Sequence, residues 1–102
     1  MAKRLTDDQI KQYHSDGYVH PVAVLSDEEV REARAAIEAF EAKSGKLFDY
    51  PEKSKSYLLF DWAARLVRHP AILDAVEDII GPDIMVYHTT MWIKDAGTPG
   101  YI

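Results

Sequence analysis

Hydrophobic residues recur every three or four positions in two long stretches of this chain, which is the period of an amphipathic helix. In residues 27–43 the apolar positions are Val30, Ala33, Ile37 and Phe40. In residues 70–80 they are Ile72, Val76, Ile79 and Ile80. The pattern predicts a helix over each stretch, with these side chains on its buried face. Weaker patterns predict two shorter helices, over residues 7–14 and 58–67.

Two capping boxes mark where helices begin. Thr6 is followed three residues later by Gln9, and Ser26 is followed in the same way by Glu29. In this motif, side chains bond backbone N–H groups that lack partners at a helix start. We therefore expect helices to begin at residues 7 and 27.

Other stretches favour extended or irregular structure. Residues 84–93 are rich in β-forming residues and partly alternate, which predicts a strand. Residues 18–25 predict only an edge or bent strand, because Pro21 cannot donate to a sheet ladder. Residues 45–56 are polar and predict a loop. Helices and strands together predict an α+β fold.

The predicted strand over residues 84–93 has too few neighbours, because two strands make a marginal sheet. We therefore expect residues 1–102 to be a fragment, or a chain that borrows a sheet from a partner. Five side chains of this stretch should not all be covered: Val86, Thr90, Met91, Trp92 and Ile93. Exposed apolar patches favour association, so soluble expression should be poor.

Composition narrows the function classes. The chain has 102 residues, enough for one domain, and 17 acidic against 12 basic residues. A net charge of −5 disfavours nucleic acid as a partner, since phosphate binding needs clustered Lys and Arg. The absence of cysteine excludes disulfides, thiolate metal sites and a cysteine nucleophile. No stretch approaches the ~20 apolar residues of a membrane helix, so a cytoplasmic location is expected.

The four histidines do not predict a metal site. None forms a ligand pair of the i, i+4 helical type, or of the alternating His-x-Asp or His-x-His type on a strand. His69 precedes Pro70, where a helix cap or a surface position is the favoured interpretation. His14 is expected at the surface at a helix end, and His88 is expected to be a hydrogen-bonded histidine rather than a ligand.

The order of several segments resembles that of the phytanoyl-CoA dioxygenase family. The segments are LTDDQI, YHSDGYV, VLSDEEV, KSYLLF, VRHPAILDAVEDIIGPDI and HTTMWIK. Each is weakly specific, whereas their order and spacing together are fairly specific. The resemblance covers nearly the whole chain but only about the first third of a family member.

This resemblance implies a truncated double-stranded β-helix, the jelly-roll or cupin-like fold. Residues 1–102 would be the N-terminal segment of this single domain, comprising outer helices and first strands. The implied activity is hydroxylation of an unactivated C–H bond of a small-molecule substrate, coupled to 2-oxoglutarate decarboxylation at Fe(II). In the family the His-x-Asp pair, a distal His and a 2-oxoglutarate-binding Arg follow the position of Gly100. No catalytic or metal residue is therefore assigned, and neither cofactor is expected to bind this chain tightly alone.

The resemblance also suggests two cosubstrate contacts. Lys55 matches a family lysine that contacts 2-oxoglutarate, although a solvated Lys55, or Lys53 in this role, is the alternative. Thr90 lies on the implied pocket strand, where its hydroxyl can bond the cosubstrate, although it can equally be a plain β-former. Tyr57 stands where relatives often carry His, which leaves its role open.

A second hypothesis is a small non-catalytic α+β domain that binds a partner. The predicted edge strand over residues 84–93 can pair with the sheet of another chain, including a second copy of this one. Self-association through this strand is therefore an expectation to be tested.

Overall fold

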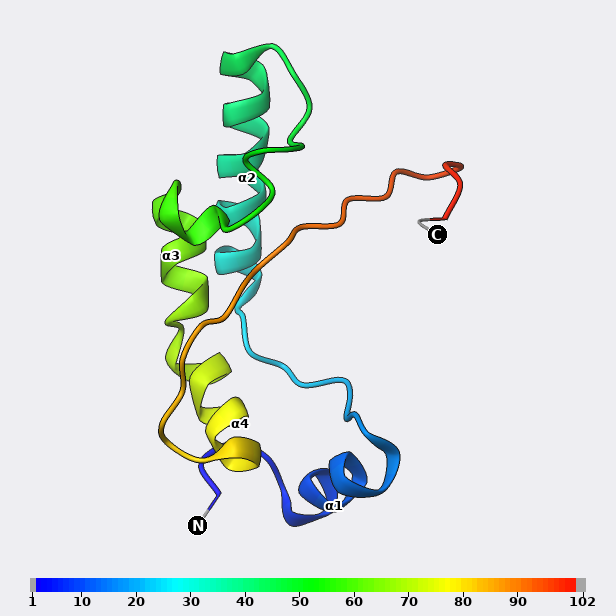
Figure 1. Cartoon of the computed structure of the whole chain (residues 1–102), viewed down its shortest axis with the longest axis vertical. Coiled ribbons are helices and arrows are strands. Elements are labelled where there is room, and N and C mark those ends of the chain that lie inside the picture. The colour runs from blue at the N-terminus through cyan, green and yellow to red at the C-terminus, as the bar shows by residue number, and fades with distance from the viewer. Residues whose placement is uncertain (1, 101–102) are drawn as a thin grey trace.

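The computed structural model describes residues 2–100. It contains α1 (Asp7–Asp16), α2 (Asp27–Ser44), the short 3-10 helix η1 (Ser56–Leu58), α3 (Asp61–Val67) and α4 (Pro70–Ile80). Helix α3 lies beside α2, and α4 follows α3 after a short break (Figure 1). The predicted helices are confirmed, except that the helix expected over residues 58–67 covers only Asp61–Val67 and is preceded by η1.

Both capping boxes form as the sequence predicts. Thr6 Oγ1 accepts the N–H of Gln9 at 3.1 Å, and Gln9 Oε1 accepts the N–H of Thr6 at 2.9 Å. Ser26 and Glu29 repeat this exchange at 3.1 and 2.9 Å. Helix α2 ends at Gly45, whose φ of 75° is a left-handed conformation that glycine adopts without a steric cost.

The predicted α+β fold is wrong for the described residues, which contain helices but no strand. Residues 84–93 run back past the helices as an extended path without regular structure (Figure 1). Their only β-type pairing among residues 2–100 is one antiparallel bridge between Ser54 and Thr90. A strand needs a second backbone alongside it, and here only a short loop segment provides one. The first strands of a jelly roll are therefore not present, and residues 18–25 form no strand either.

An aromatic cluster holds α2 against the segment that leads into α3. Its members are Phe40, Phe48, Phe60 and Trp62, with ring centroids 5.1 to 6.2 Å apart. Phe48 is buried, although it belongs to a stretch predicted as a polar loop. Its backbone N–H donates to Glu41 Oε2 at 2.7 Å, which ties the loop to α2.

Asp78 of α4 anchors the N-terminal segment. Its carboxylate accepts the backbone N–H groups of Lys3, Arg4 and Leu5 at 2.7, 2.8 and 2.7 Å. These hydrogen bonds hold the pKa of Asp78 below its ordinary value, and the bond from Leu5 has the largest effect. They place buried Leu5 in an apolar groove of about 320 Å³, which residues of α1 and α4 also line.

The molecule is open. Its Cα radius of gyration is 15.9 Å, whereas about 13 Å is usual for a compact domain of 100 residues. Met85 is 85% exposed, Tyr87 is 90% exposed and Trp92 is 66% exposed. Val86 and Ile93 are exposed too, while Thr90 and Met91 are half-buried. The expectation that Val86, Thr90, Met91, Trp92 and Ile93 are not all covered is confirmed. Poor soluble expression stays a prediction.

None of the helices in the described part of the chain is both long and apolar enough to span a membrane.

Candidate functional site

The structure brings together the two segments that carry Lys55 and Thr90. The backbone N–H of Lys55 donates to the carbonyl of Thr89 at 2.9 Å, and the N–H of Met91 donates to the carbonyl of Lys53 at 3.0 Å. These two hydrogen bonds flank the bridge between Ser54 and Thr90. Lys55 is thus the direct neighbour of the residue that faces Thr90. The sequence relates Lys55 and Thr90 only through the family resemblance, whereas in the fold the backbones of their two segments are paired.

The two candidate lysines differ in their surroundings. Lys53 Nζ forms an ion pair with Asp49 at 3.2 Å and lies 5.4 Å from the centre of the Trp92 ring. Lys55 is exposed and has no ion-pair partner within the described part of the chain. Lys55 therefore keeps its charge available for an external anion, whereas the ammonium of Lys53 is engaged internally.

Lys55 also adopts an uncommon backbone conformation. With φ 53° and ψ 43° it is left-handed, a region that non-glycine residues seldom occupy. Its N–H is held by Thr89, and its carbonyl accepts the N–H of Leu58 at 3.0 Å as η1 begins. Such outliers persist where the surrounding contacts fix them, and they concentrate at functional sites.

The Thr90 hydroxyl already has a partner. Thr90 Oγ1 and His88 Nε2 share a hydrogen bond of 2.8 Å. Alternation along an extended chain places both side chains on the face of Ser54. His88 is thus a hydrogen-bonded histidine, as the sequence predicts.

The neighbouring Thr89 shows a feature that the sequence did not single out. Thr89 Oγ1 is buried and has no hydrogen-bond partner within residues 2–100. A buried hydroxyl without a partner is costly and therefore unusual. It lies one residue from Thr90, beside the backbone contact to Lys55. Tyr57 lies half-buried in η1, and its role stays open.

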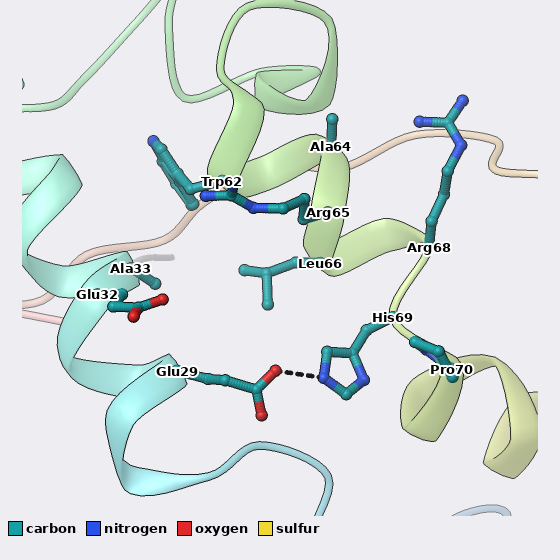
Figure 2. A pocket seen from close by; sticks show the side chains of 10 residues that line it. All are labelled: Glu29, Glu32, Ala33, Trp62, Ala64, Arg65, Leu66, Arg68, His69 and Pro70. Atoms are coloured by element: carbon teal, nitrogen blue, oxygen red, sulfur yellow. Dashed lines mark hydrogen bonds and ion pairs between the residues drawn. The ribbon is translucent and has the colours of Figure 1, made fainter.

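A pocket of about 650 Å³ lies between α2, α3 and the start of α4 (Figure 2). Its lining residues include Glu29, Glu32, Trp62, Arg65, Arg68 and His69. Arg65 extends toward Trp62, whereas Arg68 points away from the cavity (Figure 2). Neither Lys55 nor Thr90 lines this space, so the pocket is separate from the bridge.

One hydrogen-bonded pair crosses this pocket. Glu29 Oε2 and His69 Nε2 lie 2.5 Å apart (Figure 2). His69 Nδ1 accepts the N–H of Ala71 at 3.1 Å, which confirms the predicted cap of α4. The pKa of Glu29 is lowered, first by the backbone N–H of Ser26 and next by His69. Each side chain of the pair thus also caps the start of a helix, Glu29 that of α2 and His69 that of α4.

The described residues do not form a complete metal site. No group of three or more His, Asp and Glu side chains within residues 2–100 is placed to hold a metal ion. His14 is exposed at the last turn of α1, and His69 is engaged at its helix cap.

The comparison with protein families decides the relationship. A family model described as phytanoyl-CoA dioxygenase (PhyH) matches residues 13–100, which is most of the chain. The chain belongs to the phytanoyl-CoA dioxygenase family. No curated protein and no solved structure gives a significant match.

Family membership allows the described residues to be tested against the family's cofactors, Fe(II) and 2-oxoglutarate. For iron they do not fit, because no three suitable donors converge. For the dicarboxylate they fit better. The PhyH chain presents an exposed cation at Lys55, and the hydroxyl of Thr90 lies on the facing segment. A lysine ammonium and a threonine hydroxyl are both suitable donors to a carboxylate oxygen.

Proposed function

We propose that this chain supplies a 2-oxoglutarate-binding element of a non-haem Fe(II)/2-oxoglutarate-dependent dioxygenase. The activity would be hydroxylation of an unactivated C–H bond in a small molecule, coupled to decarboxylation of the cosubstrate. Membership of the phytanoyl-CoA dioxygenase family supports the reaction class. The observation that supports the binding role is the bridge between Ser54 and Thr90, which places the backbone of Lys55 next to the residue that faces Thr90.

In this proposal Lys55 and Thr90 both contact 2-oxoglutarate, Lys55 from the loop segment and Thr90 from the extended segment. The ammonium of Lys55 provides the charge, and the hydroxyl of Thr90 donates a hydrogen bond that fixes orientation. Lys53 is the weaker candidate for this contact because Asp49 already neutralises its charge. When the Thr90 hydroxyl donates to a ligand, its oxygen can still accept a hydrogen bond from His88.

The iron ligands in this proposal lie outside the described residues. Residues 2–100 provide no set of three donors, so they hold no complete iron centre. We therefore expect the 102-residue chain to bind 2-oxoglutarate weakly and to need further residues for turnover. Its small-molecule substrate is not identified by any feature of the described surface.

The test is a titration of the isotope-labelled 102-residue chain with 2-oxoglutarate, followed by NMR at constant ionic strength. We expect backbone resonances of residues 53–56 and 88–91 to shift with a dissociation constant in the millimolar range. Lys55→Met should abolish the shifts, and Thr90→Val should weaken binding about tenfold, the loss of one charge-assisted hydrogen bond. Lys11→Met, which removes an exposed lysine of α1, should leave them unchanged.

Two results of this titration would overturn the proposed binding role. One is the absence of shifts in the wild-type chain at tens of millimolar 2-oxoglutarate. The other is an equal response of Lys55→Met and the wild type. Either result would show that the chain does not bind 2-oxoglutarate at this bridge, although it belongs to the family.

A second candidate function is association through residues 84–93, either with another copy or with a partner chain. Within the described residues, none of the backbone groups of residues 85–88 has a backbone hydrogen bond. Met85 and Tyr87 are also the two most exposed large apolar side chains described. An extended segment with open backbone groups is the type of surface that pairs with a second strand.

A further inference from the structure

Lys53 lies at the junction of the two segments that carry Lys55 and Thr90. We propose that Lys53 is a positioning residue, which holds these segments in one register through Asp49 and Trp92. This inference rests on the function proposed for Lys55 and Thr90. In this role Lys53 does not contact the cosubstrate but positions the residues that do.

The side chain of Lys53 contacts both sides of the junction. On its own segment, Nζ pairs with Asp49 Oδ1 at 3.2 Å. From the facing segment, the Trp92 ring lies under the same ammonium, with 5.4 Å between Nζ and the ring centre. The carbonyl of Lys53 also accepts the N–H of Met91 at 3.0 Å. One residue thus joins the segments through its backbone and through its side chain.

The charge distribution supports this role. The Lys53 side chain is 26% exposed, whereas that of Asp49 is 70% exposed. The pKa of Asp49 is lowered, first by the backbone N–H of Tyr50 and then by Lys53. Asp49 therefore stays ionised at neutral pH and keeps the ammonium over the indole face. A cation above an aromatic face is attracted by the negative face of the ring.

The backbone alone specifies this register poorly. Within the described chain, the backbones of the two segments are joined by two hydrogen bonds, which together form the single bridge, and each hydrogen bond contributes little net free energy. A slip of one residue would turn every side chain to the opposite face. Thr90 would then leave the face that it shares with Ser54, and the pairing next to Lys55 would change. A side-chain contact beside the bridge opposes this slip.

Amide hydrogen exchange of the 102-residue chain tests the inference directly. The N–H groups of Lys55 and Met91 report the two backbone hydrogen bonds across the bridge. We expect Lys53→Met to speed their exchange about threefold to tenfold, because the cation–π contact and the ion pair are lost. Lys53→Arg keeps both contacts and should restore slow exchange.

The matched control is Lys46→Met in the same loop. Lys46 also forms an ion pair, with Glu52 at 2.9 Å, but lies outside the Trp92 contact. Its loss should leave the Lys55 and Met91 amides unchanged, and the Trp92 indole resonance should move in Lys53→Met alone. The amide of Phe40 in α2 serves as the reference for global opening. Equal exchange of the two reporter amides in Lys53→Met and the wild type overturns the inference.

The 2-oxoglutarate titration separates this inference from the proposed function. We expect Lys53→Met to raise the dissociation constant in proportion to the fraction of molecules that lose the bridge, and Lys53→Arg to restore it. A wild-type chain that binds no 2-oxoglutarate contradicts the proposed function. A Lys53→Met chain that binds normally, with its bridge amides still protected, contradicts the positioning role alone.

Discussion

Glu29 and His69 join the first turns of two helices through one hydrogen bond of 2.5 Å. Each also serves its own helix: Glu29 Oε1 accepts the N–H of Ser26, and His69 Nδ1 accepts the N–H of Ala71. Because Nδ1 accepts a hydrogen bond, the ring proton lies on Nε2, and this N–H group donates a hydrogen bond to Glu29. The pair couples the capping of α2 to the capping of α4, although 40 positions separate the two residues.

Replacement of His69 should therefore destabilise the chain more than loss of a surface side chain. We expect His69→Ala to lower the free energy of unfolding by about 1 to 2 kcal/mol, since it removes a helix cap and the bond to Glu29. His69→Asn keeps a good capping residue and should lose about half as much. Urea denaturation followed by circular dichroism measures both, with Glu32→Gln on the same helix as control. Equal stability of His69→Ala and the wild type would show that the pair contributes nothing.

Asp78 should make the fold sensitive to acid. Its pKa lies below the ordinary value of 3.8 because three backbone N–H groups bond its ionised form. A carboxylate with a lowered folded-state pKa adds stability that is full above its unfolded pKa. This stability is lost as the pH falls through the lower folded value. Unfolding free energy should therefore stay level above about pH 5 and decline below about pH 4.

The variant Asp78→Asn tests this pH dependence. It should be less stable than the wild type at pH 7, and its stability should change less between pH 7 and pH 3. Asp74→Asn provides the control, because Asp74 lies on the same helix and caps no backbone group of the N-terminal segment. If Asp78→Asn and the wild type lose the same unfolding free energy between pH 7 and pH 3, the acid sensitivity belongs to other carboxylates, Glu29 first among them.

Phe48 and Leu47 form a matched pair for testing the aromatic cluster. Phe48 is buried against Phe40, Phe60 and Trp62, whereas Leu47 is 72% exposed. Phe48→Ala should cost about 3 to 5 kcal/mol, the usual range for a buried phenylalanine. Leu47→Ala should change stability by less than about 0.5 kcal/mol. Thermal and urea unfolding measure both, and similar losses in the two variants would contradict the assigned core.

The sequence predicts the helices because their determinants are local. The apolar period of α2 and the capping pair of Ser26 and Glu29 lie within a few positions of each other, and both operate as expected. Extended structure depends on a partner backbone distant in sequence, which is why the strand expected over residues 84–93 is reduced to one bridge. Phe48 was missed for a related reason, since the polar composition of its loop conceals one buried ring.

The candidate site was only partly readable from the sequence. The resemblance names Lys55 and Thr90, but no pattern in the sequence places Ser54 opposite Thr90. The choice between Lys53 and Lys55 depends on where Asp49 and Trp92 lie, which the fold alone determines. The role of Asp78 is likewise determined by the fold alone, because the backbone N–H groups that bond its carboxylate lie more than 70 positions away in the sequence.

Self-association should proceed through the exposed part of the extended segment. Met85 and Tyr87 lie two positions apart, so an extended backbone presents them on one face. We expect the mass measured by light scattering to rise with protein concentration, because burying these side chains removes apolar area from water. The double variant Met85→Lys and Tyr87→Lys should shift this rise to higher concentration, since like charges then face each other across the contact. Leu47→Lys, at a 72% exposed position on another loop, should not shift it. A wild-type chain that stays monomeric across the accessible concentrations would contradict association, and an equal effect of all variants would place it on a different surface.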